Sequence, residues 1–219
     1  MEPVKKQPAW KEPFDLGMSA GGAGDIDNAA SHFREAVRLA PLEEYPHYEL
    51  GYSLMLLGQF ESALQELRRT NELREGFFLV QTEIYVCEMV LAGVLEHEDV
   101  AAFRQLQRLT DTRQAQSQEA VSLSRELITR APACALGHYY LGKALFTSDP
   151  KASEEALQQC LSLNPDDTIA IDALTHIGSH RSASGDSDGA RAIWLEVVAK
   201  YKNNPHVKPT EAFFLQGSV

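Results

Sequence analysis

The chain of 219 residues is 44 % hydrophobic and 23 % charged, the composition of a globular protein that can bury a core. Its formal net charge of −11 repels phosphate backbones, and no apolar run approaches the roughly 20 residues of a membrane-spanning helix. We therefore expect neither nucleic acid nor a membrane as the partner.

Residues 1–9 are predicted to be a polar tail. The tail contains basic residues, but no apolar stretch follows them, so we do not expect it to be a secretory signal. Three cysteines, Cys87, Cys134 and Cys160, are isolated and odd in number, which is typical of reduced thiols rather than of a disulfide framework. These features predict a cytoplasmic protein.

Two helix pairs are predicted next, at about residues 10–43 and 44–77. The first helix of each pair carries a Leu-Gly dipeptide, and a glycine turn such as Gly58 separates it from the second helix. The second helix carries a small residue followed four positions later by a larger apolar one, and Pro41 stands where the first pair must end.

The segment at about 78–134 is irregular. Apolar helices are predicted over 77–95 and 99–109, and ten residues without a large apolar side chain follow them. Either one helix hairpin is lengthened here or an extra helix is inserted. Asp111 and Thr112 lie in the polar gap and are residue types that begin helices, which favours the arrangement with three helices.

Two further helix pairs are predicted at about 135–168 and 171–204. The remaining segment, 205–219, is predicted to cap the last pair through Phe213 and Phe214, because the end repeat of an array must close its exposed apolar face. Self-association through these two side chains is the alternative.

The predicted pairs recur with one period. Gly17 is repeated as Gly51 after 34 residues, and His47 is repeated as His138 after 91, which is two periods and 23 residues. A glycine inside a helix costs about 1 kcal/mol relative to alanine, so we expect it to allow close approach of the paired helices. One pair cannot bury its apolar face alone, and stacked pairs therefore predict an all-α solenoid of antiparallel helix pairs.

This pattern resembles the tetratricopeptide repeat (TPR) family, whose 34-residue unit reads W-x2-L-G-x2-Y…A-x3-F…P. The resemblance covers about residues 10–204 and implies a TPR-like superhelix with an irregular or inserted helical segment in the middle. The matching residues are Leu16, Gly17, Ala20, Ala29, Phe33 and Pro41; His47, Leu50, Gly51, Leu54, Ala63 and Leu67; His138, Leu141, Gly142, Leu145, Ser153, Leu157 and Pro165; and Leu174, Ile177, Gly178, Ala190 and Trp194.

In the family, the first helices of successive units line a concave groove that holds peptides. The resemblance therefore implies a partner-binding groove in this chain, lined by Tyr45, Tyr48, Tyr52, Met55, Tyr139, Lys143 and Phe146. The first three tyrosines fall on one helical face, and tyrosine is enriched at binding hot spots. Packing against neighbouring helices is the alternative role of these side chains.

The sequence carries no pattern that indicates catalysis. His176 and His180 have a spacing that can place two imidazoles on a metal, but no third ligand stands at motif spacing, which favours a structural or surface role. We expect no enzyme activity, no metal and no cofactor. The predicted function is a protein–protein interaction module that binds a peptide or protein partner; a self-assembling scaffold or homo-oligomerising adaptor is the alternative.

Overall fold

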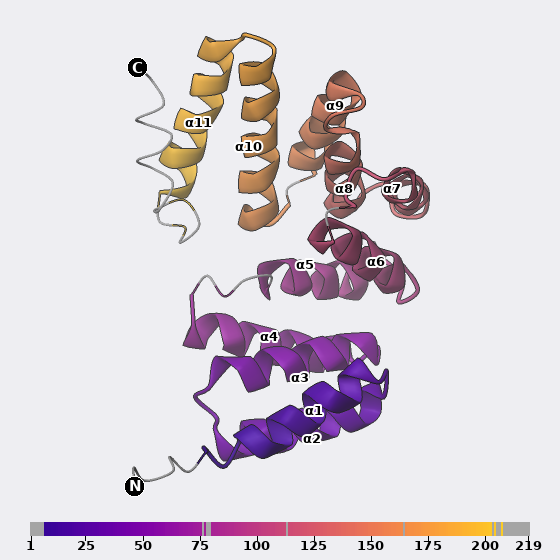
Figure 1. Cartoon of the computed structure of the whole chain (residues 1–219), viewed down its shortest axis with the longest axis vertical. Coiled ribbons are helices and arrows are strands. Elements are labelled where there is room, and N and C mark those ends of the chain that lie inside the picture. Colours follow the sequence, from indigo (N-terminus) through magenta and orange to yellow (C-terminus); the bar gives the residue numbers. More distant parts are fainter. Residues whose placement is uncertain are drawn as a thin grey trace, which may run out of the picture. The chain divides into compact units, whose positions relative to one another are not determined.

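The described part of the chain is entirely helical, as expected for an all-α protein. The structure is a computed structural model that describes residues 7–75, 77, 80–112, 114–163, 165–202, 204 and 207. These residues form 11 α-helices and no strand (Figure 1). None of the described helices combines the length and the apolar character that a lipid bilayer would require of a spanning segment.

The chain divides into two compact units, unit 1 (Met1–Leu91) and unit 2 (Ala92–Val219), and each is described by itself. The helices of unit 1 are α1 (Lys11–Gly22), α2 (Ile26–Leu39), α3 (Glu44–Leu56), α4 (Phe60–Leu73) and α5 (Val80–Leu91). Helices α1 and α2 form one hairpin and α3 and α4 form the next, while α2 also packs on α3 and α4 on α5. This stacking buries the apolar faces of the pairs, as in a solenoid.

Unit 2 continues the same design. Its helices are α6 (Asp99–Asp111), α7 (Gln118–Arg130), α8 (Ala135–Leu145), α9 (Pro150–Ser162), α10 (Asp167–Ala183) and α11 (Ser187–Tyr201). Helices α8 and α9 form a hairpin, α10 and α11 form another, and α9 packs against α10. Leu157 of α9 and Ile177 of α10 meet in the core between these hairpins.

The glycines of the Leu-Gly pairs lie where the two helices of a hairpin touch, which confirms the role expected for them. A Cβ atom added at Gly51 would lie 2.8 Å from Cγ of Leu67, and one at Gly142 would lie 2.5 Å from Cγ of Leu157. Because both leucines are fully buried, the space that a side chain would need is already filled.

The irregular segment contains three helices, α5, α6 and α7, and the boundary between the two units falls between α5 and α6. The prediction of which residues begin the last of these helices was wrong. Asp111 is the last residue of α6 and Thr112 follows it, whereas Ser117 begins α7 by accepting a hydrogen bond from the backbone N–H of Ala120. Phe213 and Phe214 lie outside the described residues.

Candidate functional site

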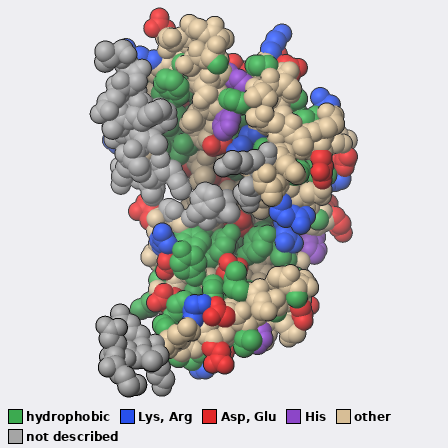
Figure 2. Space-filling view, viewed as in Figure 1, with side chains coloured by type: hydrophobic (Ala, Val, Ile, Leu, Met, Phe, Trp, Pro, Cys, Tyr) green, Lys and Arg blue, Asp and Glu red, His purple; other side chains and the backbone are tan. Residues whose placement is uncertain are grey.

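The three tyrosines predicted for the groove in unit 1 form a chain of ring contacts with Phe77. The rings of Tyr48 and Tyr52 stack with centroids 6.2 Å apart and an angle of 17° between their planes. Phe77 lies 5.0 Å from the ring of Tyr48 and 5.2 Å from that of Tyr45. We call Tyr45, Tyr48, Tyr52 and Phe77 the tyrosine cluster. Figure 2 shows hydrophobic side chains gathered over α3, α4 and α5 on the face in view.

A cation already lies against the tyrosine cluster. The guanidinium of Arg74 stands 5.6 Å from the centroid of the Phe77 ring and 3.2 Å from a carboxylate oxygen of Glu44. The hydroxyl of Tyr45 and the carboxylate of Glu44 raise the pKa of Arg74, which therefore stays charged beside the rings. The aromatic faces of the cluster and the adjacent carboxylate of Glu44 are features that attract organic cations.

Met55 does not line this surface, contrary to the prediction. Its side chain is fully buried, whereas Tyr45 is 46 % exposed. Met55 lies two helical turns beyond Tyr48 on α3, so both point to nearly the same side of the helix. That side is covered, because Phe77 packs on Tyr48 and α5 contacts α3. Met55 is therefore a core residue of unit 1.

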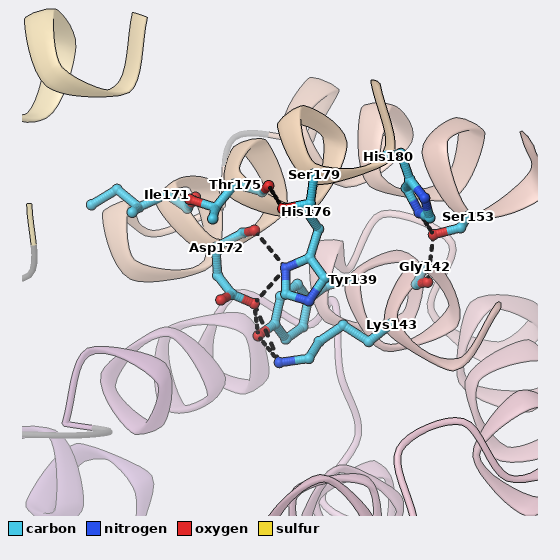
Figure 3. A network of polar contacts seen from close by, with 10 residues as sticks. All are labelled: Tyr139, Gly142, Lys143, Ser153, Ile171, Asp172, Thr175, His176, Ser179 and His180. Atoms are coloured by element: carbon cyan, nitrogen blue, oxygen red, sulfur yellow. Dashed lines mark hydrogen bonds and ion pairs between the residues drawn. The ribbon is translucent and has the colours of Figure 1, made fainter. Parts of the chain in front are cut away.

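In unit 2, two predicted groove residues on α8 meet a carboxylate on α10 (Figure 3). The hydroxyl of Tyr139 donates to Oδ2 of Asp172 at 2.7 Å, and Nζ of Lys143 donates to the same oxygen at 3.2 Å. Lys143 also donates to the Tyr139 hydroxyl oxygen at 3.0 Å. These three side chains join the first helices of two successive pairs.

The charge state of this cluster follows from its contacts. Burial alone would raise the pKa of Asp172, but Lys143, His176 and the Tyr139 hydroxyl outweigh it and hold that pKa below its usual value. Burial and the nearby Asp172 raise the pKa of Tyr139 well above its ordinary value, so its hydroxyl remains a donor. Asp172 is thus an ionised acceptor with defined donors.

The two histidines of α10 turn to different partners. Nδ1 of His176 lies 2.8 Å from the backbone oxygen of Asp172 and 3.4 Å from its Oδ2. Both atoms are acceptors, so Nδ1 of His176 carries a proton. His180 instead places Nε2 2.9 Å from Oγ of Ser153 (Figure 3). In the described part of the chain, no three potential metal ligands come together.

Phe146, the third predicted groove residue of unit 2, packs between these histidines. Its ring centroid is 5.2 Å from that of His176 and 4.1 Å from that of His180. Phe146 therefore contributes to packing between α8 and α10.

The hydroxyl of Ser153 is buried and donates to the backbone oxygen of Gly142 at 2.7 Å, so it accepts from Nε2–H of His180.

Sequence reasoning missed Asp172 and Phe77, which organise the two surfaces. Asp172 lies 33 residues after Tyr139, close to one repeat period, and this spacing is the signal that could have paired them. Phe77 begins the helix predicted over 77–95, but α5 begins only at Val80, and no pattern marks Phe77 as a neighbour of Tyr45 and Tyr48.

These features define the chain as an all-α solenoid of helix pairs, a class in which the helices of neighbouring pairs present a shared surface. Residues 14–73, which include most of α1 and all of α2 to α4, match the family model described as tetratricopeptide repeat. The match supports the tetratricopeptide repeat resemblance for these two helix pairs, where the sequence pattern also carries it.

Several solved structures are similar to the chain at low sequence identity. The TPR2AB domain of yeast Sti1, in a complex with pHSP90, is 14 % identical with a TM-score of 0.46, covering 94 % of this chain and 96 % of that one. TTC0263, a TPR protein of Thermus thermophilus, is 18 % identical with a TM-score of 0.42, covering 95 % and 100 %. MamA from Desulfovibrio magneticus RS-1, residues 41 to the end, is 19 % identical with a TM-score of 0.41, covering 90 % and 97 %. These likenesses are too distant to carry an argument about function, and no curated protein matches the chain.

Proposed function

We propose that the chain is a protein-interaction module that binds a peptide segment of its partner across the tyrosine cluster of unit 1. The observation that carries the proposal is the ordered aromatic surface: Tyr48 and Tyr52 are stacked, Phe77 supports the rings, and Tyr45 is 46 % exposed. Aromatic side chains that are already held in place give a large contact area and lose little entropy on binding.

The polar cluster of unit 2 supports the same proposal as a second contact surface. Tyr139 and Lys143 are fixed by Asp172 before any partner arrives, so their orientation costs no further ordering. We infer no catalytic role and no cofactor for either surface. A cytoplasmic location belongs to the proposal and is supported by the three buried free thiols of Cys87, Cys134 and Cys160.

The first test uses random 12-residue peptides displayed on phage and selected against the whole chain. The strongest are synthesised, and their affinities are measured by fluorescence anisotropy. The Tyr48→Ala/Tyr52→Ala double variant should weaken binding more than about tenfold, since buried aromatic anchors dominate interfaces. Leu42→Ala is the matched control: it removes a 73 % exposed apolar side chain between α2 and α3 and should change affinity less than about twofold.

Tyr48 packs on Phe77, so the double variant is accompanied by Tyr45→Ala, which alters a more exposed ring. For unit 2, the peptide affinity of Lys143→Met is compared with that of Lys151→Met. The side chain of Lys151 is 89 % exposed. Peptides that bind all the tyrosine variants like the wild type would contradict the proposal, as would a library that yields no binder. Sedimentation that shows a concentration-dependent oligomer would instead favour the self-assembling scaffold.

A further inference from the structure

A glutamate beside the tyrosine cluster has no counter-charge among the residues that the structure describes. Glu49 follows Tyr45 by four residues and precedes Tyr52 by three, so all three lie on one face of α3. Its carboxylate is partly buried and makes no hydrogen bond or ion pair within the described part of the chain. Burial raises the pKa of Glu49. A desolvated carboxylate without a partner is unfavourable, and a ligand that supplies a positive charge would relieve this cost.

The repeat shows which internal cation unit 1 lacks. In unit 2, Lys143 directly follows the glycine of the α8 Leu-Gly pair and donates to Asp172 on α10, the first helix of the next pair. In unit 1, the residue that directly follows Gly17 is Met18. Met18 is 46 % exposed and uncharged.

The acceptor side of the two surfaces follows the same register. Asp172 and His176 stand six and two residues before Gly178, and Tyr45 and Glu49 stand six and two residues before Gly51. Repeat equivalence therefore places Tyr45 at the position of Asp172 and Glu49 at the position of His176, whose Nδ1 lies 3.4 Å from Oδ2 of Asp172. Unit 2 pairs a lysine with a carboxylate across this junction, whereas unit 1 has Met18 in the place of the lysine and Tyr45 in the place of the carboxylate, with the carboxylate of Glu49 one helical turn away.

Arg74 shows that the tyrosine cluster accepts a cation. Its guanidinium lies over Phe77 and pairs with Glu44. Arg74 therefore occupies the side of the cluster at which Tyr45 and Glu44 lie. Glu49 has no equivalent partner in the described residues. The formal net charge of −11 also favours the approach of a cationic partner.

We propose that Met18, Tyr45, Glu49 and Tyr52 form a subsite for one basic side chain, lysine or arginine, of the peptide bound by unit 1. The carboxylate of Glu49 accepts a charge-assisted hydrogen bond from the ammonium or guanidinium group, and the tyrosine rings contact the cation through their faces. Met18 packs against the aliphatic stem of the basic side chain. This inference rests on the proposed function, and it names the chemistry of one side chain of the peptide that unit 1 binds.

The subsite is tested with small probes that carry only the side chain in question. The whole chain, with its tyrosines labelled with carbon-13, is titrated with the N-acetyl methylamides of lysine, arginine and norleucine, and the tyrosine ring resonances are followed by NMR. We expect saturable shifts with the two cationic probes and none with norleucine, which has the stem without the charge. The lysine and arginine titrations show which cation is preferred.

Three variants separate the carboxylate from its surroundings. Glu49→Gln should weaken binding of the cationic probes at least about fivefold, because the acceptor loses its negative charge and the ion pair with the cation is lost. Met18→Lys places in unit 1 the cation that Lys143 supplies in unit 2, so it should reduce probe binding by a similar factor. Glu61→Gln, at an exposed glutamate of α4, is the matched control and should leave the affinity unchanged.

Equal shifts with norleucine, or unchanged affinity in Glu49→Gln, would overturn the subsite. The peptides selected on phage distinguish its failure from that of the proposed function. If they depend on Tyr48 and Tyr52 but are not enriched in lysine or arginine, and the cationic probes do not bind, the interaction module stands and the cation subsite falls. If the probes bind through Glu49 but no peptide depends on the tyrosines, the proposed peptide groove falls.

Discussion

Replacement of Gly51 by alanine tests whether the α3–α4 hairpin depends on a missing side chain. The added Cβ would lie 2.8 Å from Cγ and 3.1 Å from the backbone nitrogen of Leu67, closer than a methyl group tolerates. Leu67 is fully buried, so it has no free space into which it can turn. Overpacking of this kind costs about 1–3 kcal/mol, and the approach to both side chain and backbone places Gly51 in the upper half of that range.

The same substitution also has a favourable effect, since alanine is the better helix former by about 1 kcal/mol. The net expectation is that Gly51→Ala lowers the free energy of unfolding by about 1–2 kcal/mol. Gly21 in α1 is the matched control. A Cβ there would meet only Cβ of Ala29, at an ordinary contact distance of 3.7 Å. Gly21→Ala should therefore stabilise unit 1 by up to about 1 kcal/mol.

The two variants are compared by urea unfolding, followed by circular dichroism at 222 nm, with the free energy obtained by linear extrapolation. Hydrogen exchange of peptides from α3 and α4 locates the effect in unit 1, where opening should become easier in Gly51→Ala. The reasoning is refuted if Gly51→Ala stabilises the chain as Gly21→Ala does, because helix propensity would then outweigh the contact with Leu67.

Two further predictions concern unit 2. Ser153→Ala should lower the free energy of unfolding by about 1–2 kcal/mol in thermal melts, because it leaves the buried backbone oxygen of Gly142 and Nε2–H of His180 without their shared partner. Ser162 is exposed, and Ser162→Ala should have little effect. Asp172→Asn should reduce stability at pH 7 by less than about 1 kcal/mol, since the carboxylate is 38 % exposed and screened by solvent. Because the pKa of Asp172 is lowered in the folded chain, its carboxylate stabilises the fold at a pH above the unfolded pKa. This stabilisation is lost as the pH falls through the folded pKa, so the difference in stability between Asp172→Asn and the wild type should close below about pH 4. A difference that is independent of pH would show that the Asp172 charge is not its cause.

The contacts within a helix pair could be predicted from the sequence because they depend on local spacing. The apolar positions define each helical face, and glycine marks the point where the partner helix must come close. The structure places Leu67 against Gly51 and Leu157 against Gly142, 16 and 15 residues further along the chain. Short-range periodicity is enough to establish such contacts.

The candidate site was predictable only in part. The spacing of Tyr45, Tyr48 and Tyr52 placed them on one face of a helix, but the same spacing gave no sign that Met55 is buried. Exposure on a groove-lining helix depends on what covers it. In unit 1 the cover comes from Phe77 and α5, which belong to the irregular part of the chain.

By itself, the sequence determined that the chain is built from helix pairs and which side of each helix is apolar, because these properties repeat every few residues. The tertiary structure decided which side chains meet between pairs. The junction of Tyr139, Lys143 and Asp172 depends on how far α10 is rotated and shifted against α8. That geometry comes from the packing of many buried side chains at once, and no local pattern records it.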